Sequence, residues 1–163
     1  MLYRSEANPL HPTSIKLQTR AGNDIVNSQI WEIDTNDVIR TEANFKKYVG
    51  IQERTGVTNV YNCHGLTFAS RRTGIDADKE LAKILREDKY DEVDRNNVMP
   101  GDVIIYYDKF DSFVHSGIVV ENHHGPMFSV SVVSKWGGHK EFIHNYVQCP
   151  YDSSAIKFYR INQ

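Results

Sequence analysis

The sequence predicts an α+β domain, in which helices from the N-terminal half pack on an antiparallel sheet from the C-terminal half. Helical hydrophobic patterns are confined to residues 41–90, whereas short apolar runs bounded by turn residues dominate residues 100–163. Helices followed in sequence by strands are typical of α+β domains. We expect residues 1–40 to form an arm with one strand, and the 163 residues to make a single domain.

Three segments have helical character. Thr41 can cap the first of them, and Cys63 begins the second. Asp76 or Asp78 can cap the third, which is the most clearly amphipathic because Leu81 and other apolar residues recur at helical spacing. The predicted helices span residues 41–53, 63–72 and 76–88.

Strand signals come from short runs rich in β-branched and aromatic residues that lie between turn residues. In the first of these runs, at residues 25–33, the large apolar side chains are Ile30, Trp31 and Ile33. The polar stretch at residues 122–126 has the composition of a hairpin turn. The predicted strands span residues 25–33, 102–108, 114–121, 127–134 and 156–161.

The overall charge excludes several classes of partner. Nineteen basic and 21 acidic residues give a formal charge of −2, and the basic residues are scattered. This balance disfavours binding to nucleic acid or to an anionic membrane. The N-terminus has no apolar stretch of the kind found in signal peptides, and no run is long enough to span a membrane. We therefore expect a cytoplasmic protein, or one that is exported without a cleavable signal peptide.

Cys63 is the candidate nucleophile. It follows the polar residue Asn62 and opens a helical run, where unpaired backbone N–H groups favour a thiolate. Gly65 lets another backbone approach closely. The second cysteine, Cys149, is interpreted as a small buried residue or a surface thiol, and a disulfide between the two cysteines is the alternative.

His115 is the candidate base, because an imidazole within reach of a thiol can take its proton. It starts an apolar strand, and Ser116 and Gly117 leave steric room beside it. His64 is a rival, but adjacent residues on a helix point about 100° apart, so His64 cannot readily face Cys63.

A zinc site made from Cys63, His64, His115 and another histidine is the metal alternative. Adjacent residues rarely share a tetrahedral site, and the sequence has no two-plus-two ligand spacing. We therefore expect no metal and no cofactor.

These candidates lie within three short motifs. The motifs are Asn62-Cys63-His64-Gly65-Leu66, Pro100-Gly101-Asp102-Val103-Ile104 and His115-Ser116-Gly117-Ile118. Over residues 60–136 the chain resembles the NlpC-type superfamily of papain-like cysteine hydrolases. Those enzymes typically carry Asp-Cys-Ser-Gly at the helix start, Pro-Gly-Asp before the next strand and His-x-Gly-Ile on the strand that follows. The resemblance implies a papain-like NlpC-type fold, with Cys63 as nucleophile and His115 as base.

Two departures from the family pattern concern the site. Asn62 replaces the aspartate and His64 replaces the serine, so contacts with substrate are expected to differ. The family usually places a third polar residue on the next strand to orient the base, and here that strand offers only serines. Ser134 is our prediction for this third catalytic residue. The alternatives are Ser131, Glu141 or a Cys-His dyad with no third residue.

The segment 134–144 is similar to a Ser-Lys-x-Gly…Ile-x-His stretch in bacterial relatives of this fold, and a plain hairpin is the alternative interpretation. His144 in this segment is a further partner for the base. The residues expected to contact substrate or the oxyanion are Tyr61, Asn62, His64 and Trp136.

The resemblance implies a cysteine peptidase or amidase that cleaves an amide bond in a peptide, such as a stem peptide of cell-wall peptidoglycan. One alternative is a non-catalytic module that binds peptide or protein on a degenerate hydrolase fold. Another is a thiol acyltransferase or deamidase. A toxin or effector role would add an immunity or target protein as partner.

Overall fold

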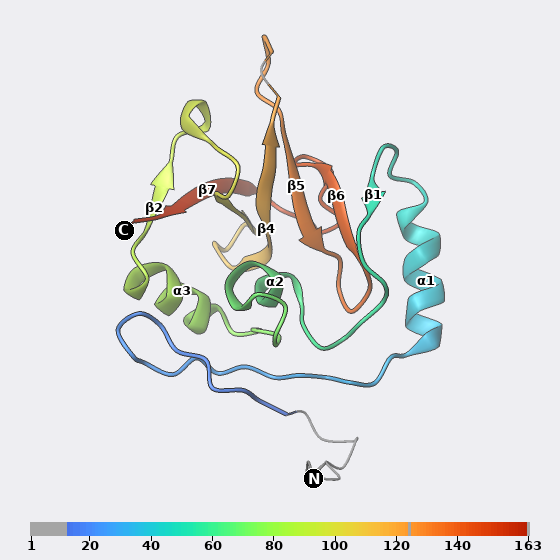
Figure 1. The fold of residues 1–163 in the computed structure, drawn as a ribbon. Coiled ribbons are helices and arrows are strands. Elements are labelled where there is room, and N and C mark those ends of the chain that lie inside the picture. The colour runs from blue at the N-terminus through green and yellow to red at the C-terminus, as the bar shows by residue number, and fades with distance from the viewer. Residues whose placement is uncertain (1–12, 124, 163) are drawn as a thin grey trace, which may run out of the picture.

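The computed structural model describes residues 13–123 and 125–162, and these form an α+β fold (Figure 1). Three helices pack against one open antiparallel sheet of seven strands, which confirms the predicted fold class. The helices are α1 (Thr35–Phe45), α2 (Cys63–Ala69) and α3 (Asp78–Glu87), with a 3-10 turn at Arg95–Asn97. The strands are β1 (Gln52–Glu53), β2 (Tyr90–Val93), β3 (Val103–Tyr107), β4 (Phe113–Asn122), β5 (Val130–Lys135), β6 (Glu141–Asn145) and β7 (Ala155–Ile161).

The sheet has the strand order β1-β6-β5-β4-β3-β7-β2, with every neighbouring pair antiparallel. Because side chains alternate along a strand, each strand contributes to both faces. Leu66 of α2 packs with Val133 on one face. Val132 packs with Tyr106 and Phe158 on the other. The sheet therefore separates two apolar clusters, and α2 covers only one of them.

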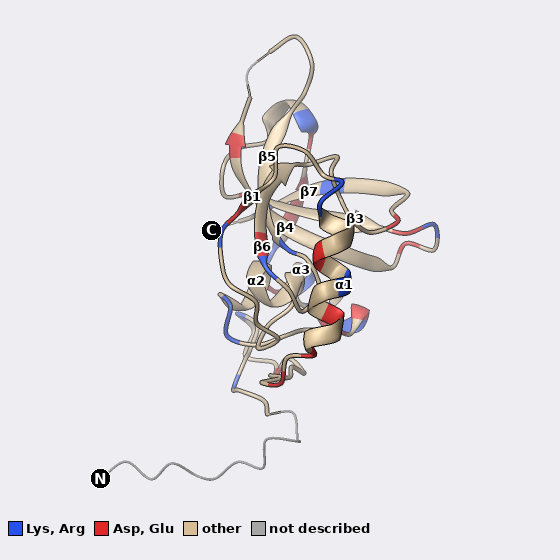
Figure 2. Cartoon of the chain, turned by 90° about the vertical axis from the view of Figure 1, so that its right-hand side faces the viewer, with Lys and Arg blue, Asp and Glu red and all other residues tan. Residues whose placement is uncertain are grey.

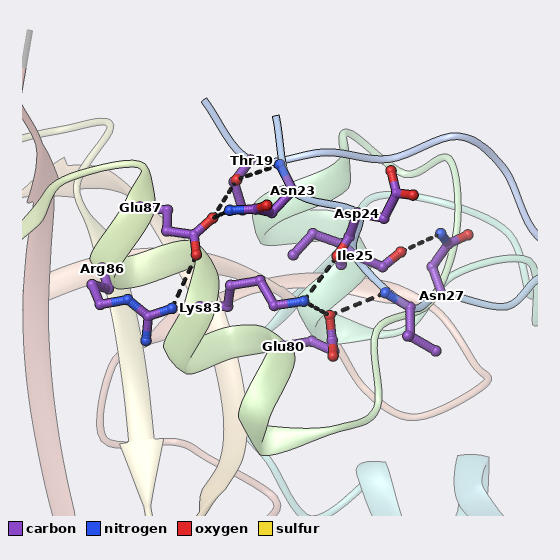
Figure 3. Close-up of polar contacts among 10 residues, drawn as sticks. Thr19, Asn23, Asp24, Ile25, Asn27, Glu80, Lys83, Arg86 and Glu87 are labelled. Carbon is purple, nitrogen blue, oxygen red and sulfur yellow. Dashed lines mark hydrogen bonds and ion pairs between the residues drawn. The ribbon is translucent and has the colours of Figure 1, made fainter. Parts of the chain in front are cut away.

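The N-terminal arm is held to α3 by polar contacts rather than by strand pairing (Figure 3). The Glu80 carboxylate accepts hydrogen bonds from the Val26 backbone N–H at 3.1 Å and from Lys83 Nζ at 2.8 Å. Glu87 accepts from Thr19 Oγ1 at 2.6 Å and from Asn23 Nδ2 at 2.9 Å. Two carboxylates of one helix thus fix the arm.

The predicted strand at 25–33 is wrong, since this region forms only isolated bridges. The Asn27 side chain supplies the reason: its Oδ1 accepts from the Ile15 N–H and its Nδ2 donates to the Ile15 carbonyl, both at 3.0 Å. The Asn27 side-chain amide therefore makes the hydrogen bonds that a paired strand would make with its backbone. Trp31 beyond it is largely exposed.

The helix predictions are correct in number but differ at their ends. Helix α1 begins at Thr35, because the Asp34 side chain accepts from the backbone N–H groups of Asn36 and Asp37. It ends at Phe45, so the predicted span of 41–53 is wrong and Thr41 lies inside the helix. The cap of α3 is the backbone of Ala77, with no side-chain capping bond.

Helix α2 begins at Cys63 as predicted, and Asn62 caps it by accepting from the Gly65 N–H at 2.9 Å. The helix ends at Ala69, before the predicted end at 72, because Ser70 and Arg71 adopt left-handed backbone conformations.

Four of the predicted strands correspond to β3, β4, β5 and β7, while β1, β2 and β6 were not predicted. Strand β6 has no hydrophobic pattern that would predict a strand, because it buries the polar residues Glu141 and His144 as well as Phe142. Strand β2 has exposed acidic residues at its centre, which resemble a loop in composition.

Charged residues of both signs are interspersed over the described chain (Figure 2). Within the described residues, no helix is both long enough and apolar enough to cross a membrane.

Candidate active site

The candidate residues gather where strands β4 and β5 separate. The pairing of these strands ends at Gly117 opposite Ser134. Beyond this point β4 continues beside β3, while Lys135 of β5 pairs with Glu141 of β6. We call this point the β4–β5 fork; α2 lies at the same end of β4 (Figure 1).

Cys63 lies at the fork and is buried. Burial raises the pKa of its thiol to about 11, while hydrogen bonding from the backbone N–H groups of Ser116, His64 and Cys63 itself favours the thiolate. The positive charge of Lys135 acts in the same direction. The thiol is therefore protonated at neutral pH in this closed arrangement, although several donors favour its ionised form.

His115 is fully buried and carries two unused hydrogen-bonding groups. Neither Nδ1 nor Nε2 has a hydrogen-bond partner among the described residues, so no hydrogen bond joins the imidazole to Cys63. Burial, together with the charges of His144 and His64, holds the pKa of His115 well below its usual value. A buried polar group without a partner is costly, so this ring marks a position where a proton donor or acceptor is missing.

Helix α2 is tied to the strand that carries His115 through Ser116. His64 Nδ1 lies 2.8 Å from Ser116 Oγ, and this hydroxyl donates to Thr67 Oγ1 at 3.0 Å. Since Ser116 uses its hydrogen on Thr67, His64 donates from Nδ1. His64 thus fixes the helix against β4, and burial lowers its pKa to about 4.

Ser134 shares a sheet face with His115 but is engaged elsewhere. Its Oγ lies 2.7 Å from His144 Nε2 and accepts from Trp136 Nε1 at 3.0 Å. His144 Nδ1 lies 2.8 Å from the Asn145 carbonyl, so Nδ1 carries the hydrogen and Nε2 accepts from Ser134. The serine hydroxyl therefore keeps one unused lone pair.

The other two alternatives for the third residue lie apart from the imidazole. Ser131 Oγ is 2.7 Å from His123 Nε2 near the far end of β5. Glu141 is fully buried and accepts from Tyr61 Oη at 2.7 Å and from Arg71 Nη2 at 3.0 Å. Its carboxylate is thus compensated by these groups on the α2 face of the sheet.

Tyr61 and Asn62 have structural contacts. The Tyr61 hydroxyl is committed to Glu141, and burial raises its pKa to about 12. Asn62 Oδ1 accepts from the backbone N–H groups of Gly65 and Ile75, and its Nδ2 donates to Asp76 Oδ1 at 2.8 Å. Asn62 therefore connects the start of α2 to the chain before α3.

Lys135 is a fully buried cation next to these groups. Its Nζ donates to the carbonyls of Gly137 and His139, both at 3.0 Å, and lies 5.1 Å from the Tyr61 ring centroid. Burial lowers its pKa to about 8. The ammonium is thus held in place beside the start of α2.

Tyr151, which was not among the predicted site residues, covers the imidazole of His115. Its ring lies 4.6 Å from the His115 ring, centroid to centroid, at an angle of 36°. It belongs to residues 146–154, the connection between β6 and β7, which we call the covering segment. Cys149 of this segment packs against the apolar cluster around Tyr106, and both cysteines are free. No local sequence pattern marks Tyr151, because strands β5 and β6 separate it from His115 along the chain.

Within residues 13–123 and 125–162, no three His, Cys, Asp or Glu side chains are arranged to hold a metal ion. Comparisons with protein-family models, with curated proteins and with solved structures found no match to this chain.

Proposed function

We propose that this protein is a cysteine hydrolase that cleaves an amide bond in a peptide, on a papain-like fold of the NlpC type. The observation that carries the proposal is the position of Cys63 at the β4–β5 fork. There the backbone N–H of Ser116, the residue directly after His115, lies near the thiol and favours its ionised form. The neighbouring residue His115 is buried with two unpartnered ring nitrogens, so it supplies a candidate base for this thiol.

The closed arrangement requires an opening step before chemistry. Cys63 and His115 are buried, and Tyr151 lies over the imidazole. Displacement of the covering segment would admit water and substrate, and hydration would bring the pKa values of both groups toward their ordinary range. The thiol proton could then pass to the imidazole.

The reaction then follows from these groups. The Cys63 thiolate attacks the substrate carbonyl and forms a C–S bond, while the carbonyl electrons move to oxygen. Backbone N–H groups of Cys63 and Ser116 stabilise that oxyanion. The C–N bond breaks as His115 returns its proton to the leaving amine. Water, deprotonated by His115, cleaves the resulting thioester and regenerates the thiol.

Ser134 and His144 act as positioning residues in this proposal. Once the site opens, the free lone pair of Ser134 accepts from the His115 ring and sets its orientation. A neutral hydroxyl stabilises an imidazolium less than a carboxylate does. We therefore expect a slower enzyme than one with a carboxylate in the third position.

Hydrolysis of an activated peptide ester tests the proposal, with Cys149→Ser as the parent background so that one thiol remains. Cys63→Ser and His115→Ala should each remove turnover, whereas His123→Ala, near the far end of β5, should not. Turnover that survives Cys63→Ser would exclude Cys63 as nucleophile. If Cys63 proves inert while the chain still binds peptide, the non-catalytic binding module is the better description. Transfer to an added amine would instead indicate an acyltransferase, and ammonia release from a glutamine peptide a deamidase.

A further inference from the structure

A pocket of about 350 Å³ is lined by residues of α1, of the turn after β5 and of the covering segment. One wall comes from α1 and the turn after it, with Phe45 and Tyr48. Trp136, which is in contact with both of these rings, and Tyr151 of the covering segment also line the pocket. Tyr151 packs on His115 as well, so one side chain contacts both the pocket and the candidate base.

The walls of this pocket are aromatic and well supported. The Phe45 and Trp136 ring centroids are 4.7 Å apart, and those of Tyr48 and Trp136 are 5.1 Å apart. Trp136 is fully buried and is fixed by its bond to Ser134. Aromatic side chains beside a small number of polar groups are typical of the lining of a ligand site.

The polar groups of the pocket favour an anion. Its lining includes Lys47 but no aspartate or glutamate. Lys47 Nζ lies 5.2 Å from the Tyr48 ring centroid. It has no carboxylate within ion-pair distance among the residues that the structure describes. The acidic residues on the other side of the Phe45 ring, Glu42 and Glu53, are paired with Lys140 at 3.2 and 3.0 Å.

We propose that this pocket is the substrate subsite for a peptide that ends in an aromatic or large aliphatic residue with a free α-carboxylate. The side chain packs against Tyr48 and Tyr151, and the carboxylate pairs with Lys47. This inference rests on the proposed function, because the subsite is useful only if the scissile amide then reaches Cys63. It defines the substrate class as short peptides with a free C-terminus.

Binding to the Cys63→Ser variant tests the subsite without depending on chemistry. The probes are N-acetyl-Ala-Ala-Phe with a free carboxylate, the same peptide with a C-terminal amide, and N-acetyl-Ala-Ala-Ala, measured by isothermal titration calorimetry. We expect the free Phe peptide to bind about tenfold more tightly than its amide. Lys47→Ala should remove this difference, and Lys47→Glu should reverse it. Added salt should weaken it, because the ammonium is exposed.

Lys46→Ala is the matched control, since Lys46 lines the acidic neighbouring pocket instead. It should preserve the preference for the carboxylate. Equal affinity for acid and amide peptides, or an equal effect of Lys46→Ala and Lys47→Ala, would overturn the subsite. Kinetics with the Cys149→Ser protein separates the two proposals: Lys47→Ala should raise KM for the acid peptide and leave kcat unchanged. Binding that shows the expected preference without any Cys63-dependent turnover would overturn the proposed hydrolase alone.

Discussion

Gly65 illustrates how one residue determines the position of α2. A Cβ built on it would lie 1.8 Å from the carbonyl oxygen of Thr73 and 2.9 Å from the carbonyl carbon. Both atoms belong to the backbone, so they cannot rotate away as a side chain could. The turn after α2 therefore packs directly on the helix that carries Cys63.

Gly65→Ala should destabilise the protein by at least about 2 kcal/mol, because the added methyl group overlaps a backbone that cannot easily yield. In an unobstructed helix the same change would stabilise by about 0.5–1 kcal/mol. Urea unfolding followed by circular dichroism measures the effect. Gly56→Ala is the control, as nothing lies within 4 Å of its Cβ position. An unchanged unfolding midpoint for Gly65→Ala would contradict the close packing of Thr73.

The covering segment links the structure of the site to its reactivity. Tyr151→Ala should expose the fork to water and move the pKa of Cys63 down from about 11. At a fixed pH below that value, the thiolate fraction should rise roughly tenfold for each unit by which the pKa falls, and the rate of alkylation should rise with it, although less steeply. Iodoacetamide labelling of the Cys149→Ser protein across pH 6–11 measures this profile. Asp152→Ala, at an exposed neighbour, is the control; equal profiles for both variants would argue against a covering role for Tyr151.

The contact between α3 and the arm should respond to acid. Hydrogen bonds from Thr19 and Asn23, together with Arg86, lower the pKa of Glu87 to about 2. A lowered carboxyl pKa stabilises the folded arm above the unfolded value of about 4.5, and this stabilisation is lost as pH falls toward 2. The protection factors of the amides of residues 19–23, which correct for the pH dependence of intrinsic exchange, should therefore fall between pH 6 and pH 2. Glu87→Gln should flatten the pH dependence, and an unchanged slope would show that another group controls it.

At the scale of the whole molecule, the fold class follows from local patterns, whereas several elements depend on contacts that no local pattern records. The periodicity of α3 and the apolar runs of β3, β4 and β7 are evident in the sequence. Asp34 is a capping residue that is visible in the sequence and that marks the start of α1. Strand β6 was hidden because it buries Glu141, whose compensating partners Tyr61 and Arg71 are distant in the chain.

The candidate site likewise contains residues that the sequence predicts and residues that it does not. Cys63 at the start of α2 and His115 on β4 were predicted as nucleophile and base from residue type and spacing; both side chains are buried, and no hydrogen bond joins them. The bond between Ser134 and His144 could not be predicted, because it joins β5 to an unpredicted strand. Tyr151 could not be predicted either, since its position depends on the path of the covering segment over the sheet.

Intact mass spectrometry of a trapped intermediate tests the central claim most directly. The Cys149→Ser protein, mixed rapidly with the p-nitrophenyl ester of N-acetyl-Ala-Phe, should gain the mass of one acyl group on Cys63 and then lose it. His115→Ala should slow the loss, because no base remains to activate water. Cys63→Ser should show no thioester. A protein that releases p-nitrophenol without any adduct, or carries the same adduct after Cys63→Ser, would contradict a nucleophilic role for Cys63.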